Sequence, residues 1–105
     1  MLIIRGINVF PSQIEHVLRS LPEVGEQFMV YVDRTKHLDE MIIEVEMTRA
    51  GFSGELQDLT RIQKKIASEL HDILGLRTAV KLVEPGSLPR FEGKARRVID
   101  RRRDL

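Results

Sequence analysis

The sequence contains no cysteine, and aromatic residues make up only 5% of its 105 residues. The lack of cysteine excludes a disulfide framework, a thiolate metal site and a cysteine nucleophile. No long apolar run opens the chain, because Leu2 to Ile4 is followed at once by Arg5. Such a run is far too short for a signal peptide or a membrane span. We therefore expect a cytoplasmic protein with no membrane partner.

Apolar residues make up 42% of the chain and charged residues 31%, the balance of a globular protein and not of a disordered one. A chain of 105 residues has room for one domain with a single core. It is small for an enzyme that binds two or three substrates, since a domain of this size usually supplies only one wall of a pocket. Catalytic residues in it would therefore indicate a missing partner.

Basic side chains are concentrated near the C-terminus. The formal net charge is only +1, but residues 85–105 hold seven of the 17 basic side chains and three of the 16 acidic ones. Such a segment attracts the phosphates of a nucleotide, a coenzyme or a nucleic acid, or it is a solvated tail that keeps the protein soluble. The basic residues are Arg90, Lys94, Arg96, Arg97, Arg101, Arg102 and Arg103.

The N-terminal part predicts a hairpin and a helix. Residues 2–10 form two short β-prone runs that meet at Gly6, which can adopt the positive φ of a tight turn. Ser12 and Glu15 have the spacing of a capping box, and Pro22 ends the helix that follows. Its apolar residues recur at helical spacing: Ile14, Val17, Leu18 and Leu21.

Residues 28–33 and 40–48 alternate between apolar and polar side chains. This period of two predicts an antiparallel pair of strands with one solvent-exposed face, on which Glu44 and Glu46 would be solvated carboxylates. The polar link at 34–39 is short enough for a hairpin.

The second half predicts a loop at residues 49–54, a helix of about five turns capped by Gly75, and a strand at 78–83. Counting the end of the first hairpin as a strand, the order becomes βαββαβ. This order predicts an α+β fold, a ferredoxin-like sandwich with two helices on one face of an antiparallel sheet, preceded by a short β-hairpin and followed by a basic tail. The apolar face of the long helix contains Leu56, Leu59, Ile62, Ile66, Leu70, Ile73 and Leu74.

Most familiar catalytic patterns are missing. His16, His37 and His71 have no metal-ligand spacing, so we predict no metal site. No glycine-rich phosphate loop and no nucleophile elbow is present. Gly93-Lys94, in a predicted loop, is a candidate for a catalytic role. A lysine beside a glycine can reach a phosphoryl group during its transfer and neutralise its charge. The alternative is an ordinary surface lysine.

Two segments, Arg5 to Glu15 and Leu88 to Arg97, together resemble the C-terminal domain of the adenylate-forming enzymes. This superfamily includes acyl- and aryl-CoA ligases, luciferases and the adenylation domains of peptide synthetases. The sequences of the two segments, "IIRGINVFPSQIE" and "LPRFEGKARRVIDRR", are most similar to those of phenylacetate-CoA ligases. The match covers nearly the whole chain. The matching residues are Gly6, Pro11, Glu15, Pro89, Gly93, Lys94 and Arg97.

The resemblance implies a ligase that joins an aryl acid such as phenylacetate to ATP, giving an acyl-adenylate, and then to CoA. It implies that Lys94 is catalytic in adenylation, and that the hairpin at Arg5, Gly6 and Asn8 binds CoA in the second step. ATP, Mg and CoA would serve the complete enzyme, and none would be bound by this domain alone.

The resemblance also implies that residues 1–105 are a mobile C-terminal lid, and that the large N-terminal adenylation domain, its main partner, is absent from this chain. We therefore expect the isolated chain to be inactive. Two alternatives stay open: a stand-alone ferredoxin-like module that binds RNA or a regulatory ligand, and an oligomerisation domain whose exposed edge strand pairs with a second copy. The few aromatics on the predicted strands, Phe28 and Tyr31 on opposite faces, argue against RNA.

Overall fold

The computed structural model describes residues 2–52, 55–88 and 97–102. A four-stranded sheet in the order β5-β4-β3-β6 forms the body of the molecule, and a separate two-stranded hairpin, β1-β2, precedes it. The elements are β1 (Leu2–Ile4), β2 (Ile7–Val9), α1 (Pro11–Arg19), β3 (Val24–Thr35), β4 (Leu38–Met47), α2 (Arg49–Phe52), α3 (Leu56–Leu74), β5 (Ala79–Val83) and β6 (Val98–Asp100).

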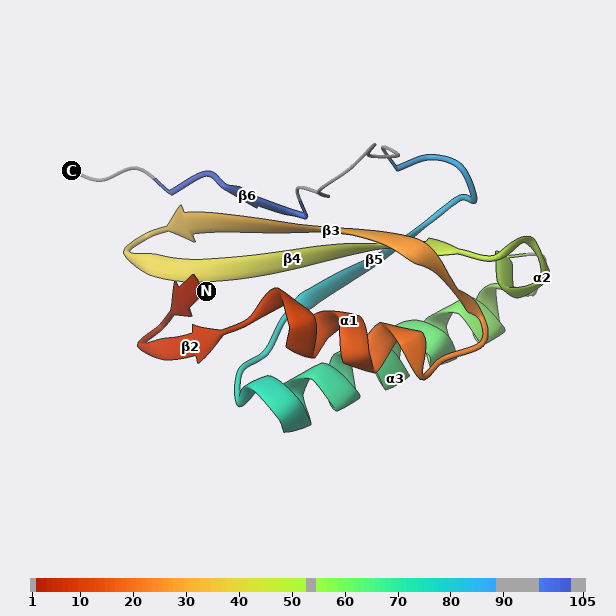
Figure 1. Ribbon diagram of the computed structural model, residues 1–105, viewed down its shortest axis with the longest axis horizontal. Helices are drawn as coiled ribbons and strands as arrows, with labels where there is room; N and C mark the ends of the chain where they lie inside the picture. Colours follow the sequence, from red (N-terminus) through yellow and green to blue (C-terminus); the bar gives the residue numbers. More distant parts are fainter. Residues whose placement is uncertain (1, 53–54, 89–96, 103–105) are drawn as a thin grey trace.

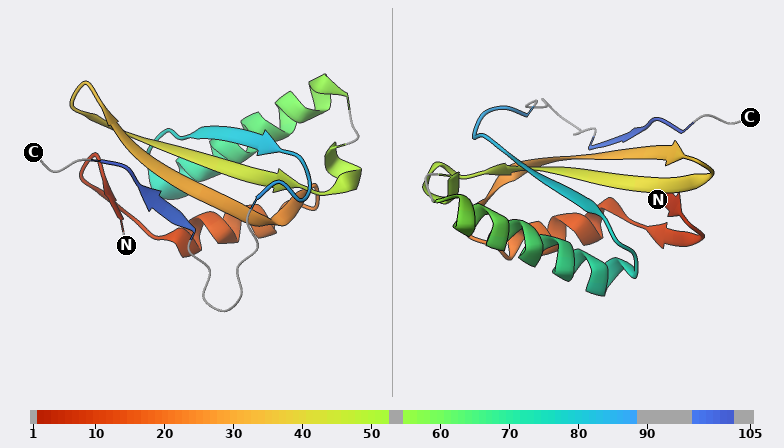
Figure 2. Two further views of the ribbon diagram at one scale, coloured as in Figure 1. Left: turned by 90° about the horizontal axis from the view of Figure 1, so that it is seen from above. Right: turned by 180° about the vertical axis from the view of Figure 1, so that it is seen from behind.

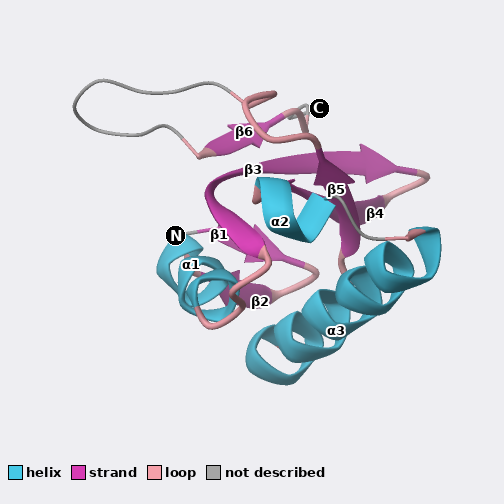
Figure 3. Ribbon diagram, turned by 90° about the vertical axis from the view of Figure 1, so that its right-hand side faces the viewer, coloured by secondary structure: helices cyan, strands magenta, loops and turns pink. Residues whose placement is uncertain are grey.

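The fold has two layers, with α1 and α3 together on one face of the sheet (Figure 1). Figure 3 shows both helices below the four-stranded sheet. Strands β3 and β4 form the long antiparallel centre of the sheet. Strand β5 lies parallel to β4, because α3 carries the chain back to the same end of the sheet before β5 begins.

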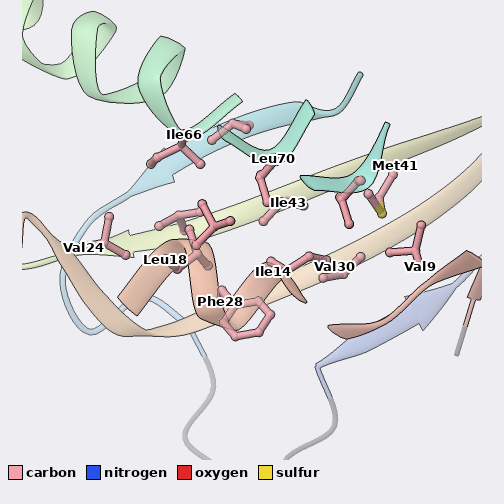
Figure 4. Close-up of a cluster of buried hydrophobic side chains, with 14 of the residues drawn as sticks. Val9, Ile14, Leu18, Val24, Phe28, Val30, Met41, Ile43, Ile66 and Leu70 are labelled. Atoms are coloured by element: carbon pink, nitrogen blue, oxygen red, sulfur yellow. The ribbon is translucent and has the colours of Figure 1, made fainter. Parts of the chain in front are cut away.

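The hydrophobic core fills the space between the two helices and the inner face of the sheet (Figure 4). The predicted helical face of α3 is buried at Ile62, Ile66 and Leu70, whereas Leu56 at its first turn is exposed. Ile4 and Val9 extend the core under the β1-β2 hairpin. The hairpin is therefore held by its own side chains against the core.

The α+β class and the position of both helices on one face are confirmed. The sheet itself is mixed and not purely antiparallel, since β5 and β6 are parallel to their neighbours. The end of the first hairpin is not one of its strands; β6, from the basic C-terminal segment, occupies the edge beside β3 (Figure 2).

Helix α1 begins two residues earlier than the predicted capping box requires. Phe10 is the N-cap, and its N–H donates to the Oε1 of Gln13 at 2.9 Å. Pro11 occupies the first helical position, where its fixed φ and missing N–H favour helix initiation. The Ser12–Glu15 box is therefore wrong, and the Gln13 side chain does the work assigned to Glu15.

The predicted wet face of the sheet is partly covered. Glu46 is only 4% exposed, and its carboxylate accepts a hydrogen bond from the N–H of Leu88 at 3.2 Å. The chain that follows β5 thus returns across this end of the sheet, and the prediction that Glu46 is solvated is wrong. The predicted loop at 49–54 is likewise corrected, because Arg49–Phe52 forms the short helix α2.

Gly75 ends α3 in the left-handed conformation, with φ 78°, as predicted. Within the described part of the chain, no helix combines the length and the apolar character needed to cross a membrane.

Candidate functional site

The β1-β2 hairpin presents a tight two-residue turn. Ile4 and Ile7 are cross-strand partners, and between them Arg5 and Gly6 have φ values of 51° and 78°. Two consecutive positive φ values identify the turn type that favours glycine. A Cβ built at Gly6 would meet nothing within 4 Å, so within this chain it is the backbone conformation, and not crowding, that favours glycine there.

The carboxylate of Asp39, at the start of β4, holds this turn in place. Its Oδ1 accepts a hydrogen bond from Arg34 Nε at 3.0 Å, and its Oδ2 accepts one from Arg102 at 3.0 Å and one from the Arg5 N–H at 3.4 Å. The Asp39 carbonyl also accepts from Arg5 Nε at 2.9 Å. One acidic residue therefore joins the first hairpin, the β3-β4 hairpin and the C-terminal segment.

Arg102 completes this network from the opposite end of the sequence. Besides Asp39, its guanidinium contacts the carboxylate of Asp100 at 2.8 Å and the carbonyl of Ile3 at 2.7 Å. The hydrogen bond from Arg34 lowers the pKa of Asp39, and that from Arg102 lowers the pKa of Asp100. Arg102, whose side chain is 16% exposed, is thus a structural part of the domain.

The predicted catalytic lysine, Lys94, lies outside the described residues, and so do its motif neighbours Pro89 and Gly93. The chain on either side of that segment is described. On its N-terminal side, the buried Leu88 donates its N–H to the carboxylate of Glu46. This contact fixes Leu88, the last described residue before that segment.

Arg97 fixes the C-terminal side of the same segment. Its Nη1 donates to Gln27 Oε1 at 2.9 Å and to the Phe28 carbonyl at 3.3 Å, and its guanidinium lies 4.8 Å from the Phe28 ring centroid. Its own carbonyl accepts the Val30 N–H at 2.7 Å. Arg97 therefore starts the pairing of β6 with β3.

A second set of arginine contacts lies directly after β6. Arg101 forms a two-pronged hydrogen bond with the carboxylate of Asp33, at 2.7 Å for each oxygen, and its guanidinium lies 4.7 Å from the Tyr31 ring centroid. Phe28 is buried and Tyr31 is paired with an arginine, so neither aromatic ring is an open platform for a nucleic-acid base. The RNA-binding alternative gains no support here.

The remaining candidate residues lie around the hairpin and α1. Asn8 is exposed on β2, opposite Ile3. Pro11 is the first residue of α1, and Glu15 forms an ion pair with Arg19 one turn later. The structure therefore brings Arg5, Gly6 and Asn8 together and gives Pro11 and Glu15 structural roles in α1.

The two candidate segments are anchored near opposite ends of the β3-β4 pair. The hairpin is tied to Arg34 and Asp39, whereas the lysine segment is tied to Glu46 and to Gln27 and Phe28. From Phe28 to Arg34 a strand advances by about 20 Å, since each residue adds roughly 3.3 Å. The two anchoring points are therefore well separated on one rigid pair of strands.

The sequence patterns did not predict the long-range structural contacts of Asp39, Glu46 or Arg102. Asp39 lies in a polar turn, Glu46 alternates like a solvated strand residue, and Arg102 lies in a basic segment. A weak signal existed for Arg102, because the apolar pair Val98 and Ile99 precedes it and forms β6. Among the residues described, no group of three or more His, Cys, Asp or Glu side chains could hold a metal ion.

Comparison with known proteins adds independent evidence. Residues 6–102 match the family described as AMP-binding enzyme C-terminal domain. The phenylacetate-coenzyme A ligase of Thermus thermophilus is 39% identical to the chain over 116 residues, which cover 98% of this chain and 26% of that protein. The chain thus spans about a quarter of the length of the curated relatives that it matches.

Two solved structures have the same fold. A domain of phenylacetate-coenzyme A ligase from Bacteroides vulgatus superimposes with a TM-score of 0.92 at 33% identity, and the match covers 100% of this chain and 95% of that one. A 2-hydroxyisobutyryl-CoA ligase, solved with 2-HIB-AMP and CoA in the thioesterification state, superimposes with a TM-score of 0.89 at 32% identity. That match covers 94% of this chain and 20% of the ligase.

Proposed function

The chain belongs to the family of AMP-binding enzyme C-terminal domains, and from that premise we propose that it is the C-terminal part of a CoA ligase that acts on phenylacetate or a similar aryl acid. The observation that carries the proposal is the match of almost the whole chain to phenylacetate-coenzyme A ligases. The activity requires a large adenylation domain, which is the main partner of this chain.

The proposed reaction has two steps. The carboxylate of the acid attacks the α-phosphate of ATP, which forms an acyl-adenylate and releases pyrophosphate. The thiol of CoA then attacks the acyl carbon, and AMP leaves as the thioester forms. Negative charge develops on the α-phosphate in the first step, so a cation placed there lowers the barrier.

Lys94 is the residue that we assign to the first step. Its ammonium group on a four-carbon stem would contact the α-phosphate oxygens and the acid as the bond forms. The contacts on both sides of its segment support this role, because Glu46 holds Leu88 before the segment and Gln27 holds Arg97 after it. Gly93 gives the backbone beside the lysine its conformational freedom.

The β1-β2 hairpin is assigned to the second step. Arg5 and Gly6 form an exposed turn, and Asn8 is exposed on the adjoining strand β2. The absence of a side chain at Gly6 leaves room for the narrow pantetheine arm of CoA. The network around Asp39 supports this role by fixing the direction of the turn.

The separation of the two anchoring points favours two poses of the domain on its partner. Their attachments lie about 20 Å apart along one strand pair, which favours separate orientations for the lysine segment and the hairpin. A rotation of the whole domain between the steps would present each in turn. The 2-hydroxyisobutyryl-CoA ligase solved in its thioesterification state supports a separate orientation of the domain for each step.

The half-reactions of the ligase containing this chain provide the test. Lys94→Ala should slow acid-dependent exchange of pyrophosphate into ATP by roughly 100-fold, as expected for one aimed charge. Thioester formation from preformed acyl-adenylate should be nearly unchanged. The matched control is Lys65→Ala, an exposed lysine of α3, which should leave both steps intact. Equal losses in both half-reactions would refute the role of Lys94.

The isolated chain offers a second test of the proposal. With ATP, CoA and phenylacetate, the 105-residue chain alone should release no AMP above background, and addition of the large domain should restore release. AMP release by the chain alone would contradict the assignment of substrate binding to the large domain.

A further inference from the structure

Arg102 contacts the β1-β2 hairpin at a backbone group that the hairpin itself does not use. The two-residue turn makes Ile4 and Ile7 a hydrogen-bonded pair. The next pair, Ile3 and Asn8, is then a non-hydrogen-bonded one, whose backbone groups point away from the partner strand. Arg102 Nη1 donates to this outward carbonyl of Ile3 at 2.7 Å. Its contact therefore lies at the register position of Asn8.

Asp39 joins the same guanidinium to a second backbone group of the hairpin. The N–H of Arg5, the first residue of the turn, donates to Asp39 Oδ2 at 3.4 Å, and that oxygen also accepts Arg102 Nη1 at 3.0 Å. Since Nη1 carries two N–H groups, one can serve Ile3 while the other serves Asp39. The backbone is therefore held on both sides of Ile4, at the point where β1 enters the turn.

Asp100 fixes the guanidinium of Arg102 in this orientation. Its Oδ1 accepts from Arg102 Nε at 3.0 Å and its Oδ2 accepts from Nη2 at 2.8 Å, a two-pronged contact that sets the plane of the group. Nη1 then faces Ile3 and Asp39. The planar fork of an arginine suits three acceptors arranged in this way, whereas a lysine is a point charge on a flexible stem.

We propose that Arg102 is a positioning residue for the thioester-forming step. It acts through the Ile3 carbonyl and through Asp39, so that the turn at Gly6 and the side chain of Asn8 meet CoA in one backbone conformation. This inference rests on the proposed role of the hairpin in the second step. A turn that is ordered before its ligand arrives loses less conformational entropy on binding, and a misplaced group can slow a reaction strongly even when the change lies away from the reacting atoms.

The test is thioester formation from preformed acyl-adenylate, measured at a series of CoA concentrations with the ligase containing this chain. Arg102→Gln should raise the KM for CoA by about tenfold and lower kcat less, while acid-dependent pyrophosphate exchange stays unchanged. Arg102→Lys should lie between the two, because it keeps a charge beside Asp39 but loses the fork. The matched control is Arg101→Gln, which removes a neighbouring two-pronged pair with Asp33 and should leave the KM for CoA unaltered.

Amide hydrogen exchange of the hairpin, followed by mass spectrometry in the same ligase, gives a second readout. Exchange across residues 5–8 should become faster in Arg102→Gln and stay as it is in Arg101→Gln. The double variant Asp39→Asn/Arg102→Gln should raise the KM for CoA about as much as the stronger single variant, because the two side chains act through one contact. Unchanged exchange in Arg102→Gln, or fully additive effects in the double variant, would overturn the proposal.

A purely structural role of Arg102 would slow both half-reactions, since adenylation uses the same domain. If Arg102→Gln does so, the milder Arg102→Lys decides, and equal losses in its two half-reactions would also overturn the proposal. Gly6→Val tests the premise separately. If it leaves thioester formation unchanged, the proposed role of the hairpin is wrong and this inference fails with it. If Gly6→Val slows that step while Arg102→Gln leaves the KM for CoA unchanged, only this inference is wrong.

Discussion

Asp39 and Arg102, 63 positions apart in the sequence, form an ion pair of 3.0 Å in which both side chains are nearly buried. Their exposed fractions are only 12% and 16%. The pair joins the start of β4 to the residues that follow β6. The same guanidinium, of Arg102, donates a hydrogen bond to the carbonyl of Ile3 in β1. The β1-β2 hairpin and the described residues around β6 therefore form one structural unit.

Asp39→Asn tests whether this unit holds the hairpin. The amide keeps the shape of the carboxylate but loses its charge, so we expect the free energy of unfolding to fall by about 1–2 kcal/mol. Amide hydrogen exchange at Arg5 and Gly6 should become faster, because the Arg5 N–H loses its charged acceptor. Urea unfolding and exchange measured by NMR provide the two readouts.

The control for this variant is Asp58→Asn. Asp58 pairs with Arg61 at 3.7 Å on the surface of α3, and both side chains are more than half exposed. Exposed pairs contribute little, so this change should cost less than about 0.5 kcal/mol and leave the hairpin amides protected. Equal effects of the two variants would contradict the role of Asp39.

The network also predicts how stability depends on pH. Asp39 and Asp100 have a pKa below the ordinary value of 3.8, caused mainly by hydrogen bonds from Arg34 and Arg102 respectively. A carboxyl with a lowered folded pKa contributes stability that is complete well above its unfolded pKa and is lost as the pH falls through the folded value. Unfolding free energies should therefore be steady from pH 7 to about 5 and decrease below about pH 4.

Urea unfolding curves at a series of pH values check this dependence. In Asp39→Asn, the decrease below pH 4 should be smaller than in the unaltered chain, because one of the two titrating groups is gone. An identical acid limb in both proteins would show that Asp39 does not titrate differently in the folded and unfolded states.

The contact between Glu46 and Leu88 leads to a separate prediction about the adenylation step. Glu46→Ala removes an acceptor from the buried Leu88 N–H, and a buried donor that loses its acceptor costs about 1–3 kcal/mol. In the ligase containing this chain, we expect acid-dependent pyrophosphate exchange to slow about tenfold, because the segment carrying Lys94 starts from a less defined position. Thioester formation from preformed acyl-adenylate should change much less.

Glu44→Ala is the matched control for Glu46, since Glu44 lies two residues earlier on the same face of β4 but is only half-buried. It should leave both half-reactions intact. If the two variants slow pyrophosphate exchange equally, the contact with Leu88 has no particular role in positioning the segment.

Much of this fold follows from local pattern in the sequence. The apolar spacing of α3, the left-handed cap at Gly75 and the tight turn at Gly6 were all predictable, because each depends on neighbouring residues alone. The antiparallel pairing of β3 and β4 also follows from alternation. These elements are confirmed with small differences at their ends.

The features that position the candidate site depend instead on long-range contacts. Glu46 has the sequence context of a solvated strand residue, and only the return of the chain at Leu88 buries it. Arg102 has the context of a basic tail, and only Asp39 and Asp100 turn it into an anchor. Periodicity within a segment cannot reveal a partner that is 42 or 63 positions away.

The turn between β3 and β4 offers a final prediction, on stability. Lys36 and His37 connect Thr35 to its partner Leu38 with φ values of 51° and 68°. Left-handed backbone costs a side-chain-bearing residue about 1–2 kcal/mol, whereas Asn-Gly suits this two-residue turn. Lys36→Asn/His37→Gly should therefore raise the free energy of unfolding by about 1 kcal/mol, after the extra chain entropy of glycine is subtracted, with a higher urea midpoint as the readout. Gly6→Ala is the opposite case at the β1-β2 turn: it should lower the midpoint, although its Cβ would meet nothing. A lower midpoint for the double variant would mean that contacts of the Lys36 or His37 side chains outweigh the backbone strain.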